Sequence, residues 1–335
     1  MKPHASLLLA LLALVGEARA DDTTPPGAAE LASSPPAASA LQWRWDTPRR
    51  LLFEVDVRLP YPMWFAAEHN KEQRAVAYQV RAVLDCSPAT AERKRAVQVD
   101  CRVEDIGLTA AGMPAKEGLL EPILQEFDQR LSTASLQLQL RRDGRILNVD
   151  IEGLERSRRR DGEIHETFRL MLSRAVAGLD LQFDPAPVSM GTVWPQYQSW
   201  IMGAPTDVGT SGSVEMLHRV EEIRPDGRVV LASAAEGLVV PGGGVDKYSV
   251  RFSSVSVFDT SSGFLTERVW SAQGRPTASS AAAEGLAGHP YDQIGRLRLL
   301  EDGEQVDVGE TREVAPPGVT PTTLQLWPSL GAFEP

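Results

Sequence analysis

The amino-acid sequence predicts a mainly β protein of the α+β class, in which antiparallel sheets of long hairpins are accompanied by two amphipathic helices. Three observations lead to this fold class. Long segments alternate apolar and polar residues with the period of two that is typical of half-buried strands. Turn sequences such as Asp-Gly separate many of these segments, and two other segments change to helical periodicity. Strands of this length with one wholly apolar face also fit a curved half-barrel.

The N-terminal 40 residues carry the signs of export. Residues 1–20 begin with basic MKPH, continue through an apolar run and end in Ala18-Arg19-Ala20, which predicts a secretory signal peptide. Residues 21–40 are rich in proline, alanine and serine and bury too little apolar surface to fold, so we expect a disordered tether. The mature protein would then lie in the periplasm, on the outer surface or outside the cell.

The composition limits the partners and suggests how the rest of the chain is divided. A formal net charge of −11 argues against nucleic acid as a partner. No later segment approaches the roughly 18 consecutive apolar residues of a membrane-spanning helix, so we expect no transmembrane segment in the mature chain. We expect residues 41–205 to form a β-rich unit with both helices, and residues 206–335 an antiparallel β unit with an extended tail.

The first strands are expected at residues 41–45 and 51–59. The second of these places Phe53 and Val55 on an apolar face. Glu54 and Asp56 point the other way, and we expect them to decorate a solvent-facing surface.

A disulfide is predicted between Cys86 and Cys101, the only two cysteines of the chain. Both lie in runs of inward-pointing apolar residues in neighbouring strands at 76–86 and 97–103. Pairing the two cysteines places Leu84 opposite Val103, so the disulfide and the hydrophobic register agree. An exported protein offers the oxidising environment that such a bond needs.

A central hairpin is expected at residues 135–153, and its register can be derived from the sequence. With Asp143-Gly144 as a two-residue type I′ turn, Leu140 lies opposite Leu147, and the next inward pairs are also apolar. Two amphipathic helices, at residues 116–131 and 162–178, flank this hairpin and are expected to cover one side of a sheet.

The second half of the chain repeats the antiparallel pattern. The proline-rich residues 181–200 are expected to cross between the halves. Further strands are expected at 214–223, 228–232, 248–258 and 264–272. A last hairpin at 296–308, with a turn at Asp302-Gly303, would pair Leu299 with Val306.

No catalytic, cofactor-binding or metal-binding residues are predicted. The sequence has no Gly-x-Ser-x-Gly elbow, and the four histidines after the signal peptide lie far apart without metal-ligand spacing. The features that remain for binding are two aromatic segments, which either pack in the core or form the wall of an apolar ligand site. The residues of this candidate wall are Trp64, Phe65, Trp194 and Trp200.

Residues 181–194, with the pattern Leu-x-Phe-x-Pro-x-Pro-Val-x-x-Gly-Thr-x-Trp, and the hairpin from Phe258 to Glu267 resemble uncharacterised exported bacterial β-rich proteins. The resemblance covers about the last 150 residues and carries no catalytic residues. Long antiparallel strands with two helices on one side are also similar in architecture to the half-barrels of periplasmic lipid and lipoprotein carriers.

Two hypotheses for the function come from different classes. The first is a non-catalytic cell-envelope protein that binds an apolar ligand or a lipidated partner inside a curved sheet. The alternative is an envelope interaction or scaffold module, which the tether and the acidic surface favour. A hydrolase without a local motif is the third, because catalytic residues need not be close in sequence.

Overall fold

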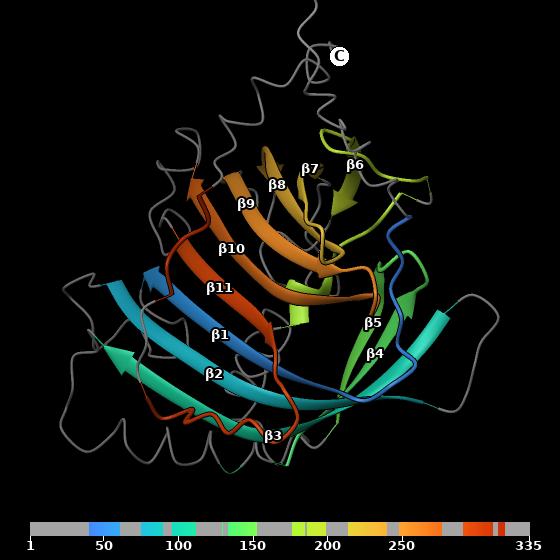
Figure 1. The fold of residues 1–335 in the computed structure, drawn as a ribbon. Coiled ribbons are helices and arrows are strands. Elements are labelled where there is room, and N and C mark those ends of the chain that lie inside the picture. The colour runs from blue at the N-terminus through green and yellow to red at the C-terminus, as the bar shows by residue number, and fades with distance from the viewer. Residues whose placement is uncertain are drawn as a thin grey trace, which may run out of the picture. The chain divides into compact units, whose positions relative to one another are not determined.

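The computed structural model describes residues 40–60, 75–89, 96–111, 129, 133–152, 176–184, 186–198, 214–239, 248–276, 291–310 and 314–318. Within these residues the chain forms one eleven-stranded antiparallel sheet (Figure 1). The strands are β1 (Arg49–Pro60), β2 (Ala75–Pro88), β3 (Ala96–Ala111), β4 (Ser135–Arg141), β5 (Ile146–Glu152), β6 (Val193–Gln198), β7 (Val214–Ile223), β8 (Arg228–Val239), β9 (Tyr248–Asp259), β10 (Phe264–Pro276) and β11 (Tyr291–Leu299).

The strand order is β5-β4-β3-β2-β1-β11-β10-β9-β8-β7-β6. The first five strands and the next five are therefore two meanders, and β11 joins them. It pairs with β1 on one edge, where Leu299 lies opposite Leu51, and with β10 on the other, where Leu297 lies opposite Arg268. The last of the described strands thus makes a single sheet out of strands from both halves.

Alternation along the strands separates an inner, apolar face from an outer face. All eleven strands contribute side chains to one buried apolar cluster on the inner face, among them Phe53 in β1, Leu231 in β8 and Leu297 in β11. The inward residues predicted for β1, β2 and β3 are confirmed where their side chains are described.

The sheet is strongly curved around this inner face. Between β4 and β9 lie six strand spacings, which would separate them by roughly 29 Å in a flat sheet. Yet a Cβ at Gly144, in the turn after β4, would lie 2.0 Å from Nε1 of Trp43. The same indole ring lies 5.8 Å from the ring of Phe258 in β9. The indole of Trp43 can contact both the turn after β4 and Phe258 in β9 only because the sheet curls around it.

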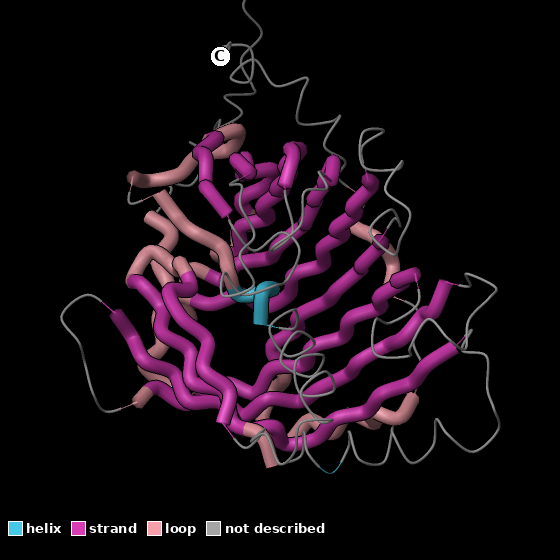
Figure 2. Tube along the Cα trace, turned by 180° about the vertical axis from the view of Figure 1, so that it is seen from behind, coloured by secondary structure: helices cyan, strands magenta, loops and turns pink. Residues whose placement is uncertain are grey.

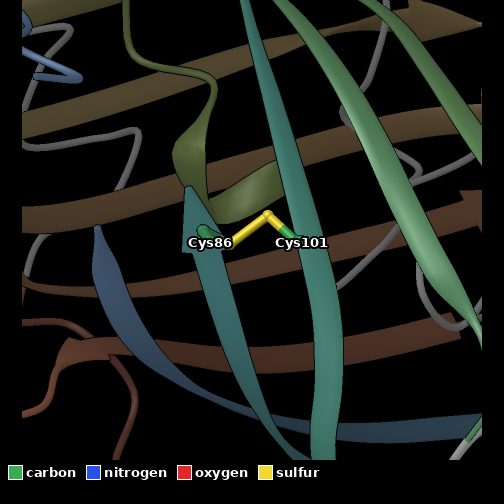
Figure 3. Close-up of a disulfide and its surroundings, with 2 residues drawn as sticks. All are labelled: Cys86 and Cys101. Atoms are coloured by element: carbon green, nitrogen blue, oxygen red, sulfur yellow. A yellow bond between two sulfur atoms is a disulfide. The ribbon is translucent and has the colours of Figure 1, made fainter. Parts of the chain in front are cut away.

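The predicted disulfide between Cys86 and Cys101 is confirmed (Figure 3). The two residues lie directly opposite each other in β2 and β3, and Leu84 lies opposite Val103 as expected. Both cysteines are fully buried in the inner cluster. The bond therefore links two strands from within the core.

The central hairpin forms, but its turn differs from the prediction. Leu138 pairs with Val149, as predicted, whereas Leu140 lies opposite Ile146 instead of Leu147. The Arg141 N–H donates to the Arg145 carbonyl at 2.8 Å, and Gly144 has a φ of 95°. The loop thus has one more residue than a type I′ turn, with the glycine in the left-handed region and a register shift beside it.

The hairpin predicted at residues 296–308 is wrong. The turn at Asp302-Gly303 forms, but both edges of β11 are already paired, so residues after the turn have no edge to join. Residues 300–310, here called the outer segment, cross the outer face of the sheet instead. Val308 packs there with Leu52 and Val83.

Glu54 was predicted to face solvent, and this is also wrong, because the outer segment covers it. Its side chain is 2% exposed and accepts a hydrogen bond from Nε of Arg81 at 2.9 Å. Arg81 also donates through Nη1 to the carbonyls of Asp307 and Glu310 in the outer segment. A buried ion pair therefore fastens the outer segment to β1 and β2.

The two predicted amphipathic helices fall almost entirely outside the described residues. What is described of the second is its end, where Val176 leads into the short 3-10 helix η2 (Ala177–Leu179). In the part of the chain that the structure describes, no helix is long and apolar enough to cross a membrane.

Breaking the disulfide tests its contribution to the fold. Replacing both Cys86 and Cys101 by alanine should lower the free energy of unfolding by about 3 kcal/mol, because the bond closes a 15-residue separation in the unfolded chain. Urea unfolding of the oxidised protein, the reduced protein and the double variant measures this change. A reductant should shift the wild-type curve and leave that of the double variant in place; identical midpoints for oxidised and reduced wild type would contradict the prediction.

Candidate functional site

The inner face of the curved sheet is the candidate site, and an aromatic cluster lies at one end of it. The cluster comprises five residues from the N-terminal segment, from the residues after η2 and from the ends of β9 and β10. Its members are Trp43, Trp45, Phe183, Phe258 and Phe264, with ring centroids 4.7–6.3 Å apart in the contacting pairs. Trp43 is anchored through Nε1, which donates to the Leu181 carbonyl at 2.8 Å. Large rings thus fill the curve of the sheet near the β4–β5 and β9–β10 turns.

Residues 176–184, here called the inner segment, run along the inner face. They include η2, which lies within the curve of the sheet in Figure 2. A Cβ at Gly178 would lie 2.8 Å from the ring of Trp270 in β10, so only glycine permits this close approach. Further along, the Gln182 carbonyl accepts a hydrogen bond from Nε1 of Trp194 in β6 at 2.8 Å. The inner segment therefore bridges β10 and β6.

A row of polar side chains crosses the otherwise apolar inner face. His218 in β7 lies opposite Ser233 in β8, which lies opposite Ser254 in β9. The ring of His218 contacts Oγ of Ser233 through Nδ1 and Oε1 of Gln196 in β6 through Nε2, each at 2.7 Å. Gln196 Oε1 also accepts from the Gln182 N–H, so His218 Nε2 donates and Nδ1 accepts from the serine hydroxyl.

His218 is held in its neutral form. It is fully buried, and desolvation, together with the positive charge of Arg268, lowers its pKa from 6.5 to about 3. The Ser233–His218 contact has the shape of a nucleophile and base pair. However, a base with this pKa takes up a proton poorly at neutral pH. The pair is better suited to anchoring than to hydrolysis.

Arg268 in β10 is a charged residue on the inner face. Its side chain is fully buried, and Nη1 donates to the carbonyls of Gly178 and Asp180 at 3.0 Å each. Nη2 donates to Oγ of Ser254 at 3.4 Å, and the guanidinium lies 5.8 Å from the ring centre of Phe252. Burial lowers the pKa of Arg268 to about 10, an effect that the carboxylate of Asp180 opposes.

Among the described residues, five buried polar atoms on the inner face have no hydrogen-bond partner. They belong to residues on the same face as the apolar cluster, and they are Arg49 Nε, Arg268 Nε, Ser256 Oγ, Gln196 Nε2 and Gln293 Oε1. Leaving a buried donor or acceptor unpaired costs about 1–3 kcal/mol. Such atoms are rare in folded proteins, so several on one face require an explanation.

The structure places one of the four residues predicted to form a ligand wall. Trp194 lies buried in β6 on the inner face, where its ring stacks on that of His218 at 5.3 Å. Trp64, Phe65 and Trp200 fall outside the described residues. Within the described residues, no group of three or more histidine, cysteine, aspartate or glutamate side chains is arranged to hold a metal ion.

The polar residues of the inner face were missed by the search for motifs, although the sequence carries a signal for them. Ser254 and Ser256 share their strand parity with the inward Phe252 and Phe258. Arg268 likewise shares parity with Trp270, two residues on. A polar residue at an inward position of an alternating strand is the signal that identifies this site.

The buried histidine predicts a dependence of stability on pH. His218 has a lower pKa in the folded protein than in the unfolded chain, so its contribution is complete above pH 6.5 and falls as the pH drops from 6.5 towards 3. Between pH 7 and pH 5 the wild type should lose about 2 kcal/mol more than the His218→Gln variant. Urea unfolding of both proteins across this range measures the difference, and parallel pH curves would contradict it.

Comparison with known proteins gives no family for this chain. No family model matches it, and no curated protein matches it. Among solved structures, this chain is similar to a structure that concerns lipid–protein interactions in lipovitellin. The TM-score is 0.46 and the sequence identity is 8%. That match covers 83% of this chain and 27% of the lipovitellin chain, so this chain spans about a quarter of the length of the protein it matches.

Proposed function

We propose that this protein is a non-catalytic cell-envelope protein that binds an apolar ligand on the inner face of its curved sheet. The observation that carries the proposal is the inner face itself, where apolar side chains from all eleven described strands surround polar atoms that have no partners. Ligand sites in proteins are mostly apolar, with a few polar groups that fix the orientation of the ligand. A sheet that only packed its own core would gain nothing from leaving such groups unpaired.

The tryptophans fit the wall of such a site. Trp194 in β6 and Trp270 in β10 lie at the two ends of the polar row, and both are buried on the inner face. Large aromatic rings provide much apolar contact area, and the indole N–H of Trp194 is already held by the inner segment. We include Trp64, Phe65 and Trp200 in the proposed wall, because they belong to the two aromatic segments of the sequence.

Export to the cell envelope is part of the proposal. It is supported by the signal-like residues 1–20 and by the buried Cys86–Cys101 bond, since disulfides form and persist mainly in oxidising compartments. An apolar ligand in such a compartment has to be shielded from water. An inward-facing apolar wall provides this shielding.

A second candidate function is protein–protein interaction at β5, an edge strand of the sheet. The two edges differ, because β6 carries Pro195, which interrupts strand pairing, whereas β5 contains no proline. On the inner face of β5, Val149 and Ile151 are half-buried and Leu147 is 46% exposed. A partly exposed apolar row on an unblocked edge is suited to pairing with another strand.

The β5 sequence suits pairing with a second copy of the same strand. An antiparallel pair centred on Val149 places Leu147 opposite Ile151 on one face. On the other face it places Asn148 opposite Asp150, so no two carboxylates lie directly opposite each other. The occupant we propose for this edge is therefore a second copy of the chain.

Ligand binding is tested with a long-chain acyl probe that carries bromine, which quenches tryptophan fluorescence on contact. Delipidated protein should bind the probe and lose fluorescence, because Trp194 and Trp270 face the proposed site. The same chain without bromine should bind and leave the fluorescence unchanged. Both the free acid and its methyl ester should be used. Absence of quenching by either form, and of lipid in native mass spectra of gently purified protein, would contradict the proposal.

Edge pairing is tested by changing the exposed leucine of β5. Leu147→Lys should convert a dimer to a monomer in analytical ultracentrifugation, because the self-pair would place a lysine against Ile151. Leu238→Lys is the matched control, since Leu238 is an exposed leucine in β8, away from this edge. Dimers that persist in Leu147→Lys, or a wild type that is monomeric throughout, would rule out this second candidate.

A further inference from the structure

Two of the residues that carry unpartnered atoms on the inner face are paired in the sheet. Arg268 in β10 is directly opposite Ser256 in β9, and both side chains are 0% exposed. Within the described residues, Nε of Arg268 and Oγ of Ser256 each lack a hydrogen-bond partner. Both atoms carry a hydrogen that can be donated. The sheet register therefore brings two unused donors together on neighbouring strands.

In the part of the chain that the structure describes, no anion is hydrogen-bonded to the guanidinium of Arg268. The described contacts of the guanidinium are with two peptide carbonyls, one hydroxyl and an aromatic ring, all of which are neutral. The carboxylate of Asp180 influences the guanidinium electrostatically, but the contact from that residue to Arg268 is made by its backbone carbonyl. Buried charges in proteins are normally paired and hydrogen-bonded, because an isolated charge in an apolar environment is costly.

The unused donors are not needed to hold the inner segment in place. Nη1 of Arg268 performs that task through the carbonyls of Gly178 and Asp180. Nε and the Ser256 hydroxyl add nothing to it. A role in binding accounts for why a guanidinium and a hydroxyl lie opposite each other on a face that is built mainly from apolar side chains.

We infer that the ligand is an apolar chain that ends in a carboxylate, and that Arg268 Nε–H and Ser256 Oγ–H donate hydrogen bonds to that carboxylate. The inference rests on the proposed binding of an apolar ligand and names its chemical class. A single negative charge matches the single positive charge of Arg268, and the two donors match the oxygen atoms of a carboxylate. The apolar side chains around the polar row contact the hydrocarbon part.

The test compares a long-chain fatty acid with the alcohol of the same chain length, at a pH where the acid is ionised. Each competes with a fluorescent acyl methyl ester for delipidated protein. The wild type should bind the acid at least roughly tenfold more tightly than the alcohol, because hydrogen bonds to charged groups are stronger than those to neutral ones. Equal affinities would overturn the inference while leaving apolar binding intact, and failure to bind either compound or the ester would contradict the proposed function itself.

Variants assign the preference to the two donors. Ser256→Ala should weaken binding of the acid roughly tenfold and leave binding of the alcohol unchanged. Ser253→Ala, on the outer face of the same strand, is the matched control and should change neither affinity. Arg268→Gln should abolish the preference for the acid. An unchanged preference in Ser256→Ala would overturn the inference.

A purely structural role gives a different result for the same variants. Removing an unpartnered buried hydroxyl leaves thermal stability unchanged or slightly higher, so Ser256→Ala is expected to fold like the wild type. Loss of acid binding in a protein of wild-type stability therefore reports on the ligand and supports the inference. If Arg268→Gln does not fold, Ser256→Ala alone decides the question.

Discussion

The double pairing of β11 is the constraint on which the rest of the structure depends. One strand near the end of the chain satisfies the open edges of β1 and β10 at the same time. Without it, two five-stranded meanders would each present an unpaired edge and half of an apolar face to water. With it, the inner wall is continuous. Paired residues such as Leu51 and Leu299 are separated in sequence by almost the whole described chain. Pairing β11 with β1 therefore carries a large entropic cost of loop closure.

The polar groups of the inner face divide into two kinds. Gln196 Oε1, His218 and Ser233 hydrogen-bond one another and link β6, β7 and β8, so they contribute to a defined arrangement of the strands. Arg268 fixes the inner segment through two carbonyls and keeps one donor unused. The first kind is what a well-packed interior requires, whereas the second has a cost that folding alone does not repay.

The alternation of apolar and polar residues predicted the parts of the fold that depend on neighbours in the sequence. The Cys86–Cys101 pairing and the four strands of the second half followed from alternation and turn residues. The order of the strands did not follow, because the pairing of β1 with β11 leaves no local signal. For the same reason Glu54 was placed in solvent: nothing near it in sequence shows that the outer segment covers it. The inward parity of Ser256 and Arg268 was readable, but it gains meaning only when the register brings the two together.

The difference between the two sheet edges limits how far any assembly can grow. A strand added at β5 uses up that edge, and in a two-fold pair of chains both β5 edges meet each other. Each chain then ends outward in β6, where Pro195 lacks the N–H that a further strand would need. Growth into a fibre requires two open edges on every subunit. The described sheet offers one, so pairing through β5 would close at two copies.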